Sequence, residues 1–262
     1  MTAPATTEPV ILTNLENGVF TLTMNRASAL NAANEEMLTA MASALTQAER
    51  DDNVRCVVVT GAGRGFCSGA DLKAGIHGSL KEHLDRTFRP VVSRMRSMAK
   101  PVVTAVNGVA AGAGASIALA GDIRVFAQSA VFVEAFIGIA LIPDAGSTWF
   151  LPRLVGYNRA FDLMVNAEKV NAEDAFAMGL CERVYPDDEF QARVKTLAEK
   201  LAMGPTKTIG LTKRALNKAM TVSLEEALEY EGQLQDIAGA SADFKEGVAA
   251  FLEKRAAKFT GK

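Results

Sequence analysis

Two carboxylates within an otherwise apolar stretch are the side chains of this sequence best suited to acid–base chemistry. Asp144 stands in the segment LIPDAGST, just before a predicted helix, and Glu134 stands in the preceding segment FVEAF. A carboxylate can take a proton from carbon only where the negative charge left on the substrate is stabilised by nearby donors. Each residue also has a purely structural interpretation. Asp144 could cap the helix that begins near Ser147, and Glu134 could be a solvated or salt-bridged residue on the same strand face as Phe136.

Two glycine-rich segments could supply the donors. VVVTGAGRGFCSGADLK (57–73) and VVTAVNGVAAGAGASIALA (102–120) both run from β-branched residues into small residues. Glycine lets the backbone approach a ligand closely, and helix N-termini carry unpaired N–H groups. Neither segment has the Gly-Lys-Ser/Thr of a P-loop or the glycine spacing of a dinucleotide-binding fingerprint. The pair therefore indicates backbone amides that converge on a developing oxyanion rather than a nucleotide site.

The remaining reactive side chains, of cysteine, histidine and serine, predict no catalytic or metal site. The three cysteines are far apart in sequence, which favours reduced thiols over a disulfide framework. His77 and His83 have no neighbouring cluster of cysteine or carboxylate, so we expect surface histidines and no metal site. Ser116 lacks the G-x-S-x-G context of a nucleophile.

Composition narrows the class of protein. The chain has 262 residues, of which 49% are hydrophobic and 22% are charged, typical of a globular protein. A net charge of −2 favours neither nucleic acid nor an anionic membrane as a partner. The first residues resemble no secretory leader, and the uncharged stretch 101–121 is broken by Pro101 and four glycines. We expect a cytoplasmic protein without a membrane span.

Hydrophobic periodicity then predicts the elements that position these residues. Strands are expected at 19–24, 54–60, 102–106, 123–127, 131–133 and 181–185, and helices at 35–49, 113–120, 147–154 and 172–178. From Pro205 onward only helices are expected, over 206–219, 223–238 and 241–258. The prediction is an α/β fold with a core at 1–204 and a helical region at 205–262 that packs on the core or on neighbouring subunits.

Several of these motifs together resemble the crotonase (enoyl-CoA hydratase/isomerase) superfamily. They are GAGRGFCSGADL, VNGVAAGAGASIALAGDI, IGIALIPDAGSTWFLPRLVG and the C-terminal EGVAAFLEKRAAKF. The resemblance implies a spiral of ββα units with a C-terminal helical trimerisation region, and a homotrimer or a dimer of trimers. It also implies an acyl-CoA thioester as substrate, with no cofactor besides the coenzyme A of the substrate itself.

By position, the resemblance assigns the oxyanion donors to the backbone N–H groups of Ala70 and Ala113. Ala113 replaces a frequent glycine of the family, so its amide is available only if its φ is negative. The two glutamates of family hydratases correspond to Ser116 and Phe136, which cannot activate water. Asp144 matches an acid–base position of family isomerases.

The same comparison with the family assigns the surroundings of the acyl-CoA. The expected binding residues are Ser28, Leu30, Ser68, Asp71, Leu72, Lys73, Val109, Phe136, Ile139, Phe251 and Lys254. Lys73, Phe251 and Lys254 would meet the nucleotide end, the last two across a subunit boundary. Phe136, Ile139, Trp149 and Phe150 would suit either a ring or a lipid tail.

These observations predict an acyl-CoA isomerase that shifts a double bond through a stabilised enolate, with Asp144 as acid and base. The motifs AAGAGA, FVEAF and IPDAGSTW are similar to family members that rearrange a ring epoxide in a CoA thioester. Two alternatives remain open. A hydratase would require Glu134 or Asp144 to activate water, and a non-catalytic acyl-CoA-binding protein would require Asp144 to be only a helix cap.

Overall fold

A six-stranded sheet forms the centre of the molecule. We describe a computed structural model, which covers residues 8–75 and 78–262. The strand order is β1-β2-β3-β5-β7-β10, parallel except for the β1–β2 hairpin. Its strands are β1 (Ile11–Glu16), β2 (Val19–Met24), β3 (Cys56–Gly61), β5 (Val102–Val106), β7 (Ile123–Ala127) and β10 (Arg183–Tyr185). The three central strands β3, β5 and β7 are almost fully buried, as the continuous apolar runs of a parallel sheet predict.

The chain also forms a second, smaller sheet, whose strands alternate along the sequence with those of the first. It has the order β4-β6-β8-β9, with β4 (Gly65–Cys67), β6 (Val109–Ala111), β8 (Val131–Val133) and β9 (Val170–Asn171). The chain passes from β3 to β4, from β5 to β6 and from β7 to β8, so each unit adds one strand to each sheet. This stepwise addition produces the spiral of ββα units that the family resemblance implies.

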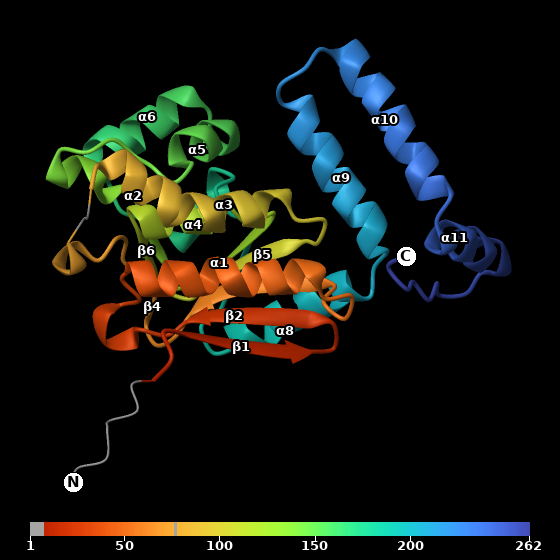
Figure 1. The fold of residues 1–262 in the computed structure, drawn as a ribbon, viewed down its shortest axis with the longest axis horizontal. Coiled ribbons are helices and arrows are strands. Elements are labelled where there is room, and N and C mark those ends of the chain that lie inside the picture. The colour runs from red at the N-terminus through yellow and green to blue at the C-terminus, as the bar shows by residue number, and fades with distance from the viewer. Residues whose placement is uncertain (1–7, 76–77) are drawn as a thin grey trace, which may run out of the picture.

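Helices cover both faces of the large sheet. In Figure 1, α1 (Glu35–Arg50) lies above β2 and β1, and α8 (Phe190–Ala202) is seen behind these strands. The α1 helix starts at Asn34, whose side chain accepts from the Met37 N–H, and its apolar face is buried. The α3 helix (Phe88–Ser97) packs beside α1. The other helices of the body are α2 (Leu80–Arg86), α4 (Ala113–Leu119), α5 (Ser147–Val155), α6 (Tyr157–Asn166) and α7 (Ala172–Ala177).

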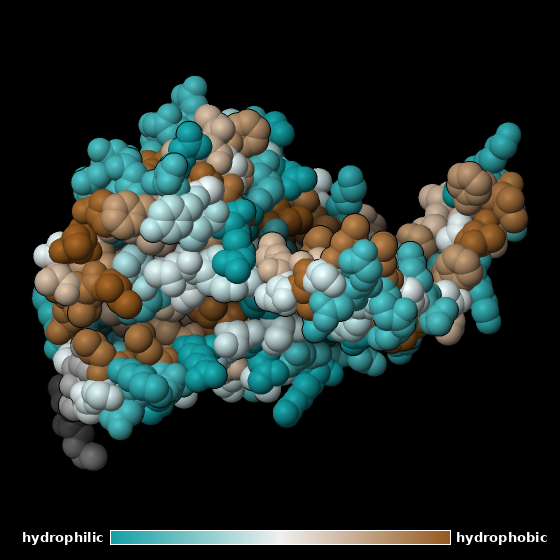
Figure 2. Space-filling view, turned by 90° about the horizontal axis from the view of Figure 1, so that it is seen from above, coloured by the Kyte–Doolittle hydropathy of each residue, from teal (hydrophilic) through white to brown (hydrophobic). Residues whose placement is uncertain are grey.

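Three helices follow Gly204 and extend away from the body. They are α9 (Thr206–Ala219), α10 (Leu224–Gly239) and α11 (Ala242–Glu253), and Figure 1 shows them as an arm on one side. Lys213 anchors the arm, because its buried ammonium pairs with Asp122 at 2.7 Å and donates to the Met95 carbonyl. Large apolar side chains on the arm are exposed, as the brown patches of Figure 2 show.

The structure confirms most of the expected elements and corrects some. The last helix, predicted over 241–258, ends at Glu253 because Lys254 takes a left-handed conformation with φ of 54°. Strands β1, β4, β6 and β9 and helices α2, α3, α6 and α8 were not anticipated. Within the described part of the chain, no helix is long and apolar enough to cross a bilayer.

Candidate active site

Three successive strands of the small sheet end at the same edge, and each delivers a candidate residue there. Ala70 follows β4, Ala113 follows β6, and Glu134 follows β8. Because β4, β6 and β8 are mutually parallel, their carboxyl ends meet at one edge. A hydrogen bond of 2.9 Å from the Gly112 N–H to the Val133 carbonyl joins the second loop to the third. Segments that are distant in the chain therefore form one site.

Glycine permits the two loops of the predicted oxyanion site to touch through their backbones. A Cβ placed on Gly114 would lie 2.0 Å from the Cys67 carbonyl oxygen, which no side chain can tolerate. Gly69 has φ of 107°, and a Cβ there would lie 3.0 Å from the Ala111 carbonyl oxygen. Only glycine at these two places allows the loops to approach so closely.

The amides of Ala70 and Ala113 are both free to face a ligand. Ala113 is the first residue of α4, so its N–H has no partner within the helix. The φ of Ala113 is not positive, so its amide is available although alanine stands where the family often has glycine. The residues on either side of Ala70 bond to Ala33, through the Gly69 carbonyl and the Asp71 N–H, at 2.7 and 2.9 Å. The Ala70 N–H therefore points away from Ala33.

Both amides border a pocket of about 380 Å³. Its walls are mainly apolar and come from the α1 N-terminus, the two glycine-rich loops, α2, α3 and the segment after β8. Its large apolar lining residues are Leu72, Leu80, Leu84, Phe88, Phe136, Ile139 and Leu141. The Asp144 carboxylate, from the segment before α5, also lines the pocket. A mainly apolar pocket with few polar groups is typical of a small-molecule site.

Asp144 has the environment of a base rather than of a helix cap. Helix α5 is capped by Gly146 without any side-chain bond, so the capping interpretation is wrong. The Asp144 Oδ1 atom is buried and accepts no hydrogen bond from the described residues. Burial raises the pKa of the carboxyl from 3.8 to about 6. A carboxylate with this pKa is ionised at neutral pH and still basic enough to accept a proton from an activated carbon.

Glu134 differs from the sequence-based interpretation. It is fully buried rather than solvated, has no cation partner among the described side chains, and caps the 3₁₀ turn Ala135–Ile139 instead of continuing β8. The Ser147 hydroxyl donates to its Oε1 atom. Burial and the nearby Asp144 charge raise the pKa of Glu134 to about 7, against the opposing effect of the Ser147 hydrogen bond. Glu134 does not line the pocket.

The expected acyl-CoA contacts are only partly brought together. Ser68, Asp71, Leu72, Phe136 and Ile139 line the pocket. Ser28, Leu30, Lys73, Val109, Phe251 and Lys254 do not, and neither do Trp149 and Phe150. Phe251 lies on α11 and Lys254 caps it, on the arm that Figure 1 places at the opposite end of the molecule from α2. Asp71 forms an ion pair with Arg26 at 2.8 Å, and Arg26 thereby stabilises the glycine-rich segment 57–73.

Sequence reasoning missed part of the pocket wall because it did not predict α2 and α3. His83 on α2 was expected at the surface, but it is half-buried, lines the pocket, and leaves its Nδ1 atom buried without a partner. His77 lies outside the described residues. Phe88, on α3, is buried beside His83. A sign was available in Ser79 and Glu82, which form a capping box at the start of α2.

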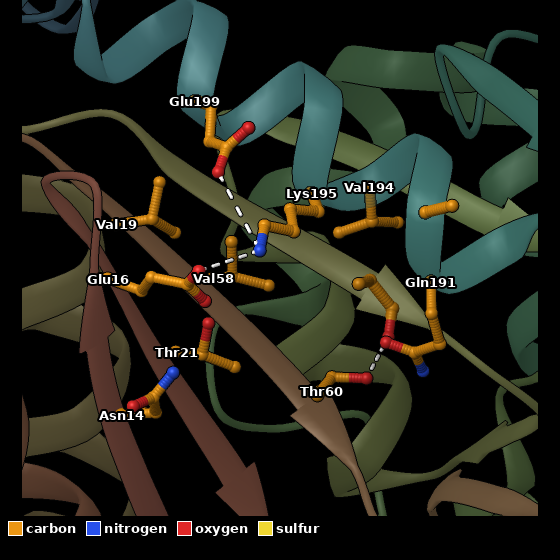
Figure 3. Close-up of a pocket in the computed structure, with 12 residues that line it drawn as sticks. Asn14, Glu16, Val19, Thr21, Val58, Thr60, Gln191, Val194, Lys195 and Glu199 are labelled. Atoms are coloured by element: carbon orange, nitrogen blue, oxygen red, sulfur yellow. Dashed lines mark hydrogen bonds and ion pairs between the residues drawn. The ribbon is translucent and has the colours of Figure 1, made fainter.

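A second cleft lies between the large sheet and α8, and Figure 3 shows its lining. Its two carboxylates share one cation, because Lys195 lies between Glu16 at 2.9 Å and Glu199 at 3.9 Å. Thr60 donates to the Ala105 carbonyl at 2.8 Å. This cleft presents no group with a free catalytic function.

Comparison with known proteins agrees with the geometry. The model of the family described as enoyl-CoA hydratase/isomerase matches residues 14–262. This chain belongs to that family. An Escherichia coli (strain K12) relative named 1,2-epoxyphenylacetyl-CoA isomerase is 47% identical, covering 96% of this chain and 98% of its own. A Rhodobacter capsulatus relative with the name "Probable enoyl-CoA hydratase" is 42% identical, covering 95% and 96%.

The fold of this enoyl-CoA hydratase/isomerase family member has close solved counterparts. An enoyl-CoA hydratase from Bacillus anthracis superposes with a TM-score of 0.92 at 33% identity, covering 97% of this chain and all of the other. The expected crotonase fold is confirmed, and the chain is an enzyme of the crotonase family that acts in enoyl-CoA hydratase or isomerase chemistry. Relatives named for each of these two reactions are found.

Proposed function

We propose that this enzyme is an acyl-CoA isomerase in which Asp144 is the single acid–base residue. The observation that carries the proposal is the half-buried Asp144 carboxylate, which lies in the same pocket as the Ala70 and Ala113 amides. Its Oδ1 atom is buried and accepts no hydrogen bond from the described residues. The positions that correspond to the hydratase glutamates hold Ser116 and Phe136. Ser116 is fully buried and donates to the Asp144 carbonyl at 2.9 Å, and Phe136 is part of the apolar lining.

The reaction requires one proton and no water. The Asp144 carboxylate removes a proton from the α-carbon of a 3-enoyl thioester, and the electron pair moves into the thioester carbonyl to give a dienolate. The Ala70 and Ala113 N–H groups donate to the dienolate oxygen. The Asp144 carboxylic acid then returns the proton to the γ-carbon, which leaves the conjugated 2-enoyl thioester and restores the carboxylate. A mainly apolar pocket limits competing attack by water.

The acyl group that we propose is ring-containing or a short lipid chain. Phe88 and Phe136 among the aliphatic lining residues suit a flat ring as well as an alkyl tail. The Escherichia coli relative is named for an epoxide of phenylacetyl-CoA, which supports a ring-epoxide rearrangement in phenylacetate catabolism as the finer assignment. An enoyl chain from fatty acid metabolism is the other substrate class.

We further propose a homotrimer or a dimer of trimers, with residues 205–262 as the oligomerisation region and residues 1–204 as the core. The arm exposes Leu216, Leu224, Leu228, Phe244, Phe251 and Leu252, more apolar surface than a monomer normally leaves uncovered. In such an assembly Phe251 and Lys254 would reach the nucleotide end of the substrate in a neighbouring subunit. Light scattering is expected to give a multiple of three chains, and a monomer at micromolar concentration would contradict this arrangement.

Two assays on one preparation test the isomerase assignment. We expect conversion of a 3-enoyl-CoA to the 2-enoyl-CoA at a turnover typical of enzymes, about 10 s⁻¹. Crotonyl-CoA, in contrast, should lose almost none of its conjugated-thioester absorbance, because no pair of glutamates activates water. Rapid hydration of crotonyl-CoA would favour the hydratase alternative, and absence of both reactions would favour a binding protein.

A further inference from the structure

Glu134 is a buried acid that the proposed mechanism does not use. Its side chain is fully excluded from solvent, and it forms one hydrogen bond, from the Ser147 hydroxyl to Oε1. Its Oε2 atom is buried with no partner among the described residues. An ionised carboxylate in such a place costs several kcal/mol unless a cation or further donors compensate.

The groups that act on Glu134 come from two neighbouring elements. The Ser147 hydroxyl reaches it from α5, and the Asp144 carboxylate acts on it from the loop before α5. The ion pairs of the described residues bring no lysine, arginine or histidine to it, and no cation contributes to its electrostatic environment. Two neighbouring acids without a cation do not both ionise readily, so the pair loses its second proton only as the pH rises through neutrality.

Glu134 is also connected to the loop that carries Asp144. Ser147, which donates its hydroxyl to Glu134, donates its backbone N–H to the Asp144 carbonyl at 3.0 Å. The same carbonyl accepts from Ser116 on α4 at 2.9 Å. The Glu134 carboxyl is therefore linked to the base loop, and through Ser116 to the helix whose first amide belongs to Ala113.

We propose that Glu134 is a positioning residue for Asp144. Glu134 must hold a proton while Asp144 is ionised, and when Glu134 loses that proton at alkaline pH it displaces the Asp144 loop. This inference rests on the proposed role of Asp144. The protonated Glu134 stays buried and accepts from Ser147, which holds the loop in place. The ionised form is driven toward water and pulls on Ser147, so the enzyme needs one proton on the pair of acids.

The test is the pH dependence of kcat/KM for 3-enoyl-CoA isomerisation, measured for the natural enzyme and matched variants. For the natural enzyme we expect a bell-shaped profile that falls about tenfold or more between pH 7 and pH 8.5 as Glu134 ionises. Glu134→Gln keeps the acceptor for Ser147 but cannot lose a proton, so its alkaline limb should disappear. Ser147→Ala removes the hydroxyl through which Glu134 acts on the Asp144 loop, so its alkaline limb should be weaker than that of the natural enzyme.

Glu199→Gln, on α8 and outside the pocket, is the control and should keep the natural profile. A merely structural role would lower activity equally at every pH. An alkaline limb that is absent from the natural enzyme, or unchanged in Glu134→Gln, overturns the proposal.

Infrared spectroscopy provides a measurement that does not depend on activity. The difference between the natural enzyme and Glu134→Gln should contain the band of a protonated carboxyl at pH 6, which disappears with the alkaline limb. In Asp144→Asn this band should disappear at lower pH, because the neighbouring charge is gone. Full isomerase activity in Asp144→Asn would refute the proposed function, whereas absence of the protonated band would refute the role of Glu134 alone.

Discussion

The two clefts of this enzyme contain the same acidic residue type under opposite conditions. In the cleft between the large sheet and α8, Glu16 and Glu199 share the ammonium of Lys195, and the Glu16 side chain is 56% exposed. At the small-sheet edge, Glu134 is buried and Asp144 is half-buried. Among the described residues neither acid has a cation partner, and each has one buried carboxylate oxygen without a hydrogen bond. Acids that are unpaired and removed from water acquire pKa values near neutrality, which suits them to proton transfer at neutral pH. The difference supports the small-sheet edge as the proposed site of the reaction.

The largest expected effect comes from removing the unpaired base. Asp144→Asn keeps the shape of the side chain but not its basicity, so isomerisation should fall by about 10²–10⁴-fold. Folding and acyl-CoA binding should persist, which circular dichroism and calorimetric titration would check. The matched change in the other cleft, Glu199→Gln, should leave the rate unchanged. A fully active Asp144→Asn enzyme would show that the contrast between the clefts has no catalytic meaning.

A slightly smaller loss is expected from separating the two backbone loops at the pocket. Gly114→Ala places a methyl group against the Cys67 carbonyl, so the Ala70 and Ala113 amides must move apart. Loss of one oxyanion donor typically lowers kcat by 10²–10³-fold, and we expect about 10²-fold here. Gly138→Ala is the control, since a Cβ there meets nothing within 4 Å. Unchanged kcat in Gly114→Ala would mean that these amides are not the oxyanion donors.

The acid limb of the pH profile also reports on Asp144, with a smaller expected effect than its substitution. Asp144 must be ionised to accept a proton, and burial raises its pKa to about 6. The value of kcat/KM should therefore fall about tenfold per pH unit below pH 6. A limb near pH 4, the range of an ordinary exposed carboxyl, would show that the base does not experience the burial seen here.

Stability should respond to Asp144 in the opposite direction to activity. Its pKa is higher in the folded protein, at about 6, than its ordinary value of 3.8, so the folded state binds the proton more tightly. Ionisation therefore costs stability above pH 6, and this cost is absent below about pH 4. Asp144→Asn should raise the thermal unfolding midpoint by a few degrees at pH 8, and the difference should vanish at pH 4. An equal midpoint at pH 8 would contradict the cost assigned to the buried charge.

The smallest effect is expected in the paired cleft. Lys195→Met removes an exposed ion pair, and exposed pairs contribute little to stability because water screens both charges. Neither the thermal midpoint nor kcat/KM should change measurably. A large loss of activity would give the cleft of Figure 3 a function that its geometry does not indicate.

Much of the site could be predicted from the sequence because its backbone parts are encoded locally. The glycine-rich segments after β4 and β6 and the Asp144 segment before α5 carry their own turn and helix signals. The pocket wall formed by α2 and α3 was missed. The apolar face of α3, in which Phe88, Val91, Val92 and Met95 are buried, does not reveal which distant elements it packs against. His83 was assigned to the surface because no cluster of cysteine or carboxylate stands near it in the sequence.

The sequence by itself determined the alternation of strands and helices, the two glycine-rich loops and the identity of the Asp144 segment. These depend on periodicity and on backbone freedom, which neighbouring residues encode. Only the tertiary structure decided that Asp144 is not a helix cap and that Glu134 is buried beside it without a cation. Burial and the absence of a counter-ion depend on which distant elements pack together, and no local pattern in this chain specifies that.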